Sequence, residues 1–111
     1  MNLLNVDGTS VAVDQEGFLV DLKDWRESVA EALAKEEGMT LQAEHWEILR
    51  LLRDFYQEYQ LSPATRPLIK YTVLKLGPDK GNSMHLNRLF KGTPAKLAAK
   101  LAGLPKPSNC I

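Results

Sequence analysis

The only cysteine of this 111-residue chain, Cys110, is the next-to-last residue. A thiol usually either packs as a small hydrophobe or carries out chemistry, and a residue one position from a terminus is seldom buried. We therefore interpret Cys110 as a chemically active thiol; the alternative is an exposed cysteine of no consequence, which would be open to oxidation. The thiolate is the nucleophile. Lys106 is the nearest cation in sequence and the terminal carboxylate opposes it, so activation is expected from a partner's pocket or from the basic C-terminal half.

The segment before this cysteine predicts an arm. Pro105 and Pro107 lack amide hydrogens and favour extended backbone in the residues before them. At about 3.1 Å per residue, Pro105 to Cys110 would reach on the order of 15 Å. We expect a mobile C-terminal arm over residues 104–111, a semi-rigid stalk with the thiol at its tip. Its stalk residues are Gly103, Leu104, Pro105, Lys106 and Pro107.

No other group of residues forms a reactive constellation. His45 falls within a long apolar-periodic segment and His85 near the start of a short one, so both are interpreted as structural. One cysteine and two separated histidines do not make a metal site. No phosphate-binding loop or catalytic triad is visible, so we expect neither a metal nor a cofactor.

Length and composition predict one domain over residues 1–103, followed by the arm. No run approaches the roughly 20 apolar residues of a membrane helix. The start "MNLLNVDG" lacks the basic and apolar regions of a signal peptide. A single cysteine cannot form an internal disulfide. Together these features predict a soluble protein of a reducing cytoplasm with no membrane contact.

Charge is divided unevenly along the chain. Residues 1–65 hold 5 Lys/Arg and 13 Asp/Glu, a net of −8, whereas residues 66–111 hold 9 Lys/Arg and 1 Asp, a net of +8. One interpretation is that the halves attract each other across the fold or spread their charges over solvated faces. The other is a basic surface near the C-terminal end, offered to an acidic partner or to RNA. On the second, Lys96 and Lys100 are candidate docking residues.

Apolar periodicity predicts a mainly helical chain with a small β element, a mainly α (α+β) class. Val11 and Val13, followed by Phe18 and Val20, predict a hairpin over residues 10–21 that turns near Gly17. Five helical segments follow. The first begins near Asp21–Asp24 and ends at Gly38; the second, central to the core, follows a cap at Thr40; the third begins at Ser62-Pro63 and ends at Gly77; the fourth is capped by Ser83; the fifth runs from Thr93-Pro94 to Gly103.

These blocks resemble one known family. The C-terminal stretch "PAKLAAKLAGLPKPSNCI" is similar to that of the DsrC/TusE family, whose members end in such an arm with a penultimate cysteine. "DQEGFLVDLKDW", "VAEALAKEEG", "EHWEILRLLRDFYQEY" and "GPDKGNS" extend the resemblance over nearly the whole chain. The resemblance implies an orthogonal helical bundle with an N-terminal β-hairpin, a helix-turn-helix-like portion and a mobile arm. It also implies a sulfur relay in which Cys110 carries a persulfide.

A second position separates branches of this family. Family members that are partners of dissimilatory sulfite reductase carry another cysteine eleven positions before their last cysteine. The corresponding position here, eleven before Cys110, is Ala99. Single-cysteine members resemble TusE, which implies that sulfur comes from a TusBCD-like complex. It is then passed to a MnmA-like thiouridylase for 2-thiolation of the wobble uridine in tRNA. The resemblance therefore implies a sulfurtransferase-type carrier that is not a stand-alone catalyst.

Two alternatives stay open at this point. The chain could be a DsrC-like partner of a sulfite reductase or a regulatory paralogue, although Ala99 argues against the first. It could instead be a helix-turn-helix module that binds nucleic acid through Arg66, Lys70 and Lys75. This second pattern lacks a cluster of base-reading side chains, so direct DNA binding is not expected.

Overall fold

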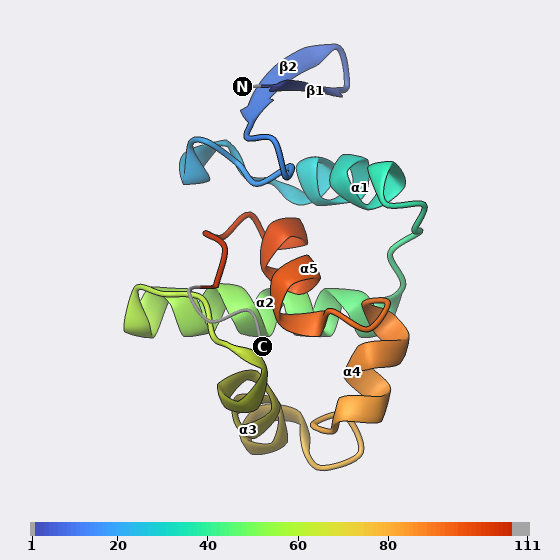
Figure 1. Ribbon diagram of the computed structural model, residues 1–111, viewed down its shortest axis with the longest axis vertical. Helices are drawn as coiled ribbons and strands as arrows, with labels where there is room; N and C mark the ends of the chain where they lie inside the picture. The colour runs from blue at the N-terminus through green and yellow to red at the C-terminus, as the bar shows by residue number, and fades with distance from the viewer. Residues whose placement is uncertain (1, 108–111) are drawn as a thin grey trace.

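The computed structural model describes residues 2–107, which form a hairpin followed by helices (Figure 1). The strands are β1 (Asn2–Val6) and β2 (Thr9–Val13), and a short 3-10 helix, η1 (Leu22–Asp24), follows them. The α-helices of this range are α1 (Glu27–Glu36), α2 (Ala43–Tyr59), α3 (Thr65–Leu76), α4 (Ser83–Leu89) and α5 (Pro94–Leu101). The mainly helical class with a small N-terminal hairpin is confirmed.

The hairpin lies earlier in the chain than expected. β1 pairs antiparallel with β2, with Val6 opposite Thr9. The connecting Asp7 and Gly8 both have positive φ, 52° and 83°, as the favoured two-residue hairpin turn requires, and Asp-Gly is a preferred sequence for that turn. The predicted pairing around Gly17 is reduced to one bridge between Val13 and Leu19. The expected range of 10–21 was wrong because the Asp-Gly signal was overlooked.

The helices α2, α3 and α4 begin at other residues than the sequence predicted. The cap of α2 is Gln42 and not Thr40, since Gln42 forms a capping box with the third helical residue. The cap of α4 is Asn82, whose side chain accepts from the amide of His85, three residues on, so Ser83 is the first helical residue. Helix α3 begins at Thr65, three residues later than Ser62. The predicted start of α5 at Thr93-Pro94 is confirmed.

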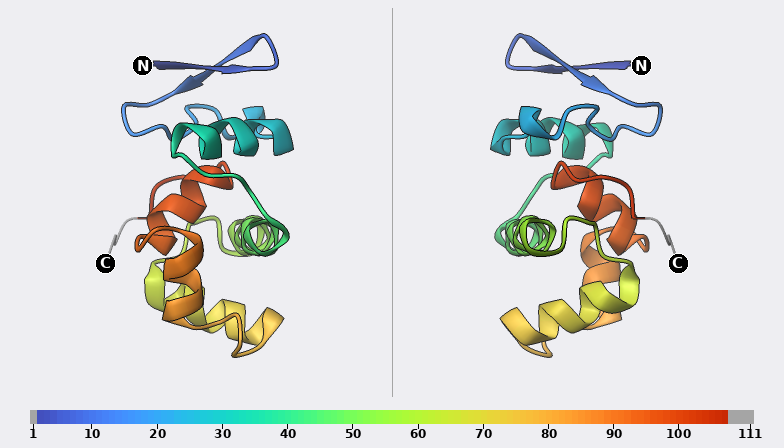
Figure 2. Two further views of the ribbon diagram at one scale, coloured as in Figure 1. Left: turned by 90° about the vertical axis from the view of Figure 1, so that its right-hand side faces the viewer. Right: turned by 90° about the vertical axis from the view of Figure 1, so that its left-hand side faces the viewer.

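Helix α5 lies at the centre of the bundle. It contacts α1, α2, α3 and α4. Figure 1 shows it between α1 and α2, and the side views in Figure 2 place it below α1 and beside α2. Ala95, Ala98 and Ala99 of this helix are buried, and such small side chains let the neighbouring helices approach closely. The C-terminal end of α5 is therefore surrounded by other elements before the arm begins.

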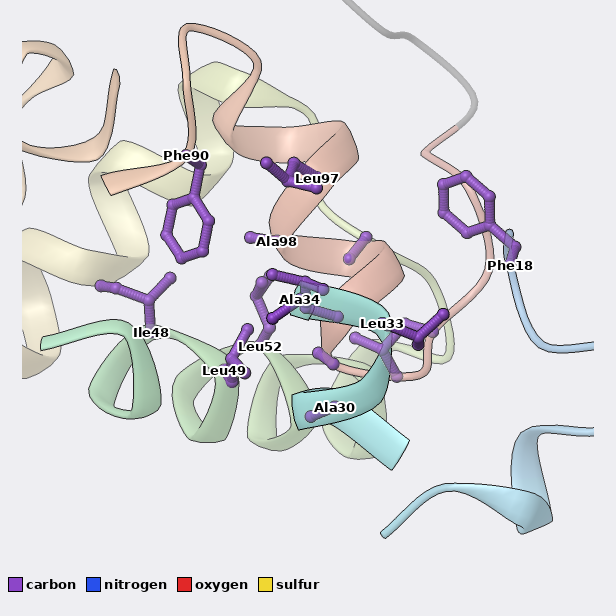
Figure 3. Packing of buried hydrophobic residues seen from close by; sticks show 14 of the residues in the cluster. Phe18, Ala30, Leu33, Ala34, Ile48, Leu49, Leu52, Phe90, Leu97 and Ala98 are labelled. Carbon is purple, nitrogen blue, oxygen red and sulfur yellow. The ribbon is translucent and has the colours of Figure 1, made fainter. Parts of the chain in front are cut away.

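One apolar core joins the helices to the hairpin. Ile48, Leu49 and Leu52 of α2 are completely buried, and Figure 3 shows them facing Ala98 and the side chains of α1. The inner face of the hairpin adds Leu4, Val6, Val11 and Val13 to this core. The buried face of α2 ends before its last turn, since Tyr59 is 50% exposed. No helix within residues 2–107 combines the length and apolarity that a bilayer crossing needs.

Candidate functional site: the base of the C-terminal arm

Cys110 and the rest of segment 108–111 lie outside the described residues. What the structure describes is the base of the arm, residues 103–107, which we call the arm base. The position and mobility of the thiol therefore stay predictions. The arm base shows how the protein holds the chain that leads to it.

The end of α5 directs the arm base back onto the helix. Gly103 has φ +73° and its amide donates to the carbonyl of Lys100 at 3.1 Å. The amide of Leu104 donates to the carbonyl of Ala99 at 2.9 Å. These two bonds form a Schellman motif, which needs a left-handed residue at Gly103. Leu104 is consequently turned inward and only 3% exposed.

Two side chains from elements distant in the sequence donate hydrogen bonds to the carbonyls at the end of α5. Trp25 Nε1 donates to the carbonyl of Leu101 at 2.9 Å, and Arg53 Nη1 donates to that of Ala102 at 2.7 Å. The Arg53 guanidinium carbon lies 3.9 Å from the centre of the Trp25 ring, within the range of a cation–π contact. A cation at this end also complements the negative end of the helix dipole. Burial lowers the pKa of Arg53, but a guanidinium stays protonated in proteins.

Gly103 is needed at this grip for a second reason. A Cβ at this position would lie 2.2 Å from Cδ1 of Trp25. The left-handed backbone and the close approach of the indole thus both exclude a side chain. The backbone of Gly103 therefore packs directly against the indole ring of Trp25.

Ser62 and Glu16 hold the next residues of the arm base. Ser62 is 7% exposed and its Oγ donates to the carbonyl of Pro105 at 2.5 Å. The Glu16 carboxylate accepts from Lys106 Nζ at 2.9 Å and pairs with Lys96 Nζ at 2.8 Å. The amides of residues 16 and 18 donate to the Asp14 side chain, which orders the turn carrying Glu16. Hydrogen bonds from Lys96 and then Lys106 lower the pKa of Glu16 to about 2.

These contacts correct the stalk expected to begin at residue 104. Leu104, Pro105 and Lys106 are each held by the body, and Pro107 is buried. The physical reason is that the body supplies partners for the polar groups of this segment. Ser62 donates to the Pro105 carbonyl, and Glu16 accepts from the Lys106 ammonium. Within the described chain, the arm lies on the body as far as Pro107.

The charge asymmetry is used largely inside the molecule. Lys100 pairs with Glu37 at 2.5 Å, and Lys96 pairs with Glu16. Lys80 pairs with Glu47, and Arg88 lies 3.5 Å from Glu44. Each of these pairs joins the basic half to the acidic half, which confirms the interpretation that the two halves attract each other. Docking through Lys96 and Lys100 stays a prediction.

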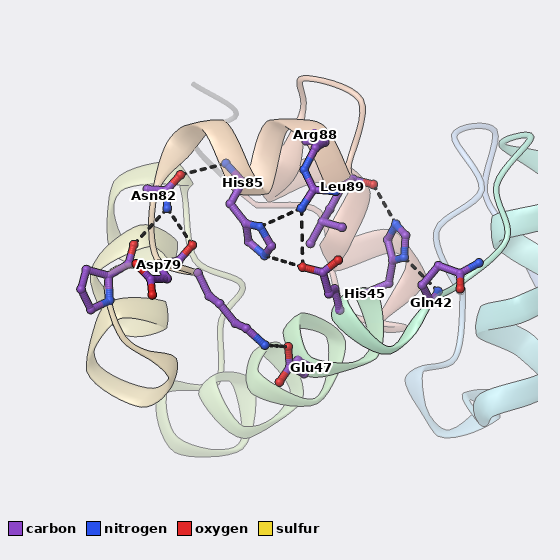
Figure 4. A network of polar contacts seen from close by, with 11 residues as sticks. Gln42, His45, Glu47, Asp79, Asn82, His85, Arg88 and Leu89 are labelled. Atoms are coloured by element: carbon purple, nitrogen blue, oxygen red, sulfur yellow. Dashed lines mark hydrogen bonds and ion pairs between the residues drawn. The ribbon is translucent and has the colours of Figure 1, made fainter.

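His45 has a structural environment. Its Nδ1 accepts from the Gln42 amide at 3.0 Å, and its Nε2 lies 3.0 Å from the carbonyl of Leu89 (Figure 4). Since a carbonyl only accepts, these partners select the neutral tautomer with the proton on Nε2. His45 therefore ties the start of α2 to the end of α4, as its structural interpretation predicted.

His85 belongs to a polar cluster between α2 and α4. Its Nδ1 accepts from Arg88 at 3.1 Å, and its Nε2 lies 3.8 Å from the Glu44 carboxylate (Figure 4). His85 Nε2 is buried, and none of the residues that the structure describes forms a hydrogen bond with it. Among residues 2–107, no three His, Cys, Asp or Glu side chains gather as a metal site requires.

The remaining candidate residues lie apart from the arm base. Arg66, Lys70 and Lys75 are exposed on α3, where Lys75 lies 5.4 Å from the centre of the Tyr71 ring. Ala99, the position that separates the family branches, is 0% exposed on α5. A side chain at position 99 therefore points into the core.

The residues that grip the arm base were not identified from the sequence. Ser62 was expected at the start of a helix, and no contact with the arm base was predicted for Trp25, Arg53 or Glu16. They lie 43, 76, 49 and 90 residues from their partners in the arm region, respectively. A local pattern carries no signal for such pairings.

The fold and the site define a class: a small helical protein whose C-terminal segment is clamped to the body until three residues before its only cysteine. The family model described as "DsrC like protein" matches residues 5–111. The chain belongs to this DsrC-like family.

Several relatives are similar over their full lengths. The chain is 50% identical to "Sulfurtransferase TusE homolog" of Haemophilus influenzae over 109 residues, 98% of this chain and 100% of the relative. It is 48% identical to "Sulfurtransferase TusE" of Photorhabdus laumondii over 111 residues, the whole of both chains.

Solved structures share the fold as well. The NMR structure of Allochromatium vinosum DsrC matches with a TM-score of 0.90 and 48% identity, over 99% of this chain and 98% of that one. The crystal structure of the oxidized gamma-subunit of the dissimilatory sulfite reductase (DsrC) from Archaeoglobus fulgidus matches with a TM-score of 0.85 and 41% identity, over 99% and 100%. The expected family and its helical bundle are confirmed.

Proposed function

We propose that this protein is a sulfur-relay carrier that holds sulfane sulfur as a persulfide on Cys110. The observation that carries the proposal is the position of the only thiol, three residues beyond the clamped arm base. The sulfurtransferase names of relatives about half identical over their full lengths support it. A carrier of this kind needs one thiol and no cofactor.

The proposed chemistry is thiol exchange. The Cys110 thiolate attacks the outer sulfur of a donor persulfide, forming a bond between its Sγ and that sulfur. The S–S bond of the donor breaks, and the donor leaves as a thiolate. The outer sulfur of the new Cys110 persulfide is then attacked by the acceptor, which releases the Cys110 thiolate again. No net oxidation occurs in either transfer, so neither an oxidant nor a reductant is required.

The finer proposal is a role in tRNA 2-thiolation. Because Ala99 supplies no second thiol, an intramolecular disulfide cannot form and each transfer must pass through Cys110 alone. We infer a TusBCD-like complex as donor and a MnmA-like thiouridylase, acting on the wobble uridine of tRNA in the cytoplasm, as acceptor. The TusE names of the relatives support this branch.

The direct test is mass spectrometry of the intact protein. After incubation with a cysteine desulfurase, L-cysteine and the donor complex, we expect the mass of the protein to rise by one sulfur atom. A reducing agent should remove the added sulfur. The matched control is Cys110→Ser, which should stay unmodified. A gain that persists in this variant, or no gain in the unaltered protein, would contradict the proposal.

A basic surface beside the arm base is the proposed docking site for an acidic partner. Lys96 and Lys100 are its candidate residues, although both also form internal ion pairs. The single variant Lys96→Glu loses both a surface cation and the pair with Glu16. The exchange Glu16→Lys/Lys96→Glu keeps a pair between positions 16 and 96, although it replaces the ion pair of Glu16 with Lys106 by two like charges. If position 96 must be cationic for docking, both variants should bind the donor complex more weakly; binding restored by the exchange would contradict docking through Lys96.

The second candidate is a partner of a sulfite reductase, which the likeness to the Archaeoglobus fulgidus gamma-subunit favours. Ala99 opposes it. Deleting the gene separates the two: loss of 2-thiouridine from tRNA supports the thiolation role. Unchanged 2-thiouridine, together with co-purification of a sulfite reductase, supports the second candidate.

A further inference from the structure

We propose that Ser62 is a positioning residue for sulfur transfer, because it fixes the point from which the chain to Cys110 departs. This inference rests on the proposed function and adds to it a residue outside the arm. The evidence is the bond from Ser62 Oγ to the carbonyl of Pro105 at 2.5 Å, between residues 43 positions apart.

The Ser62 hydroxyl is not used by the helix that follows it. A serine before a proline near a helix start usually caps that helix. Here α3 begins at Thr65 after Ala64, and no side chain caps it. Ser62 is nevertheless 7% exposed, and burying a hydroxyl without a partner costs free energy. Its donation to the arm base is the contact that satisfies it.

The Pro105 carbonyl is a natural group for the body to hold. Neither Pro105 nor Pro107 has an amide hydrogen, so the arm base cannot be held by donors at these two positions. Ser62 acts between two other contacts: Leu104 is buried before it, and Lys106 pairs with Glu16 after it. Of these, only the Ser62 bond fixes the backbone between the two prolines.

The anchor sets how far the thiol can range. Cys110 follows Pro107 by three residues, and three extended residues span at most about 11 Å. If the arm base were released after Leu104, six residues would separate the thiol from its anchor. Effective concentration falls roughly as the −3/2 power of tether length, so doubling the tether lowers it by about threefold. On this proposal, the Ser62 bond raises the effective concentration of Cys110 at a partner that docks on the body.

The test compares two variants that each lose a buried hydroxyl. Ser62→Ala removes the donor to the arm base. Thr72→Val is the matched control, since Thr72 is completely buried and its Oγ1 donates to the carbonyl of Leu68 within α3, at 2.7 Å. Both should unfold at lower denaturant concentration than the unaltered protein. Ser62→Thr, which keeps the hydroxyl, is the rescue variant.

Three measurements are made on each protein. The first is the ¹H–¹⁵N heteronuclear NOE of the Leu104 and Lys106 amides, which reports fast backbone motion. The second is the rate of sulfur transfer from loaded Cys110 to the acceptor at sub-saturating concentration. The third is the rate of Cys110 alkylation by iodoacetamide, a small reagent that needs no docking.

For Ser62→Ala we expect a lower NOE at Lys106 and slower sulfur transfer, by at most about threefold because the Lys106–Glu16 pair remains, with little change in alkylation. Thr72→Val should leave all three unchanged, and Ser62→Thr should restore both NOE and transfer. A Ser62→Ala protein with unaltered NOE and transfer would overturn the proposal. So would an equal loss of transfer in Thr72→Val, since general destabilisation would then explain it. The NOE involves no sulfur, so it tests the anchor even if the unaltered protein takes up no sulfur and the proposed function fails.

Discussion

The guanidinium of Arg53 lies 3.9 Å from the centre of the Trp25 ring, and the two side chains donate to adjacent carbonyls at the end of α5. Trp25 comes from the segment before α1 and Arg53 from α2. The pair thus joins three elements at the point where the arm base begins. The two hydrogen bonds therefore hold the C-terminal end of α5 in place.

Arg53→Met should destabilise the fold strongly. The methionine keeps an apolar stem but removes the cation over Trp25 and the donor to Ala102. Losing a charge-assisted hydrogen bond and leaving a part-buried carbonyl unpaired should lower the free energy of unfolding by about 2–3 kcal/mol. Urea denaturation followed by circular dichroism measures this loss.

Arg50→Met, on the same helix, is the matched control. Arg50 is 66% exposed, lies 5.8 Å from the centre of the Trp46 ring and pairs with Glu27 at 3.5 Å. Such an exposed pair is worth at most about 1 kcal/mol. Equal losses for Arg50→Met and Arg53→Met would contradict the role of the Trp25 contact.

Gly103→Ala should cost more than an ordinary change at a left-handed glycine. The new Cβ would meet the positive φ and also the indole of Trp25 at 2.2 Å. Strain at positive φ costs about 1 kcal/mol and overpacking adds about 1–3 kcal/mol. Gly92→Ala shows the effect of positive φ alone, since Gly92 has φ +83° and none of the described residues lies within 4 Å of its Cβ position. Thermal unfolding of both variants should give the larger shift for Gly103→Ala; similar shifts would argue against a tight Trp25 contact.

Stability should depend on pH through Glu16. Lys96 and Lys106 lower the pKa of its carboxyl from 4.5 to about 2. Since this pKa is lower in the folded state, the ion pairs stabilise the fold fully above the unfolded value near 4.5 and lose their effect as pH falls towards about 2. The difference in unfolding midpoint between the unaltered protein and Glu16→Gln should therefore shrink over that range. It should also shrink with added salt, because the pairs are partly exposed.

Carbon-detected NMR of the Glu16 carboxyl reads the same linkage directly. A midpoint near the ordinary value for glutamate would show that the two lysines do not hold this carboxylate in solution. A stability difference that persists at about pH 2 would assign the effect of Glu16→Gln to something other than charge.

Ala99→Cys should add a thiol that reagents cannot reach in the folded protein. Position 99 is 0% exposed on α5, and a buried thiol reacts slowly. Thiol titration should give the same count of fast-reacting groups as the unaltered protein under native conditions. One additional thiol should react after denaturation. An additional fast-reacting thiol in the native state would mean that the end of α5 opens readily.

Local sequence patterns determined much of this protein. The apolar spacing of residues 41–60 predicted the central helix, since a 3.6-residue period is a property of neighbouring positions. Gly38 and Gly77 marked helix ends, because glycine readily adopts the positive φ found after a helix. The motif blocks predicted the family. The hairpin was misplaced although Asp7-Gly8 is a local signal, so that error was one of interpretation.

The clamp on the arm base was decided only by tertiary structure. "GLPKP" by itself favours an extended chain, and this local preference was overridden by contacts from Trp25, Arg53, Ser62 and Glu16. Those contacts arise because packing α5 between α1 and α2 brings donors to carbonyls 43–76 residues away in sequence. The identity of the single thiol was thus readable from the sequence, whereas the point from which the chain departs towards it depends on how the helices pack.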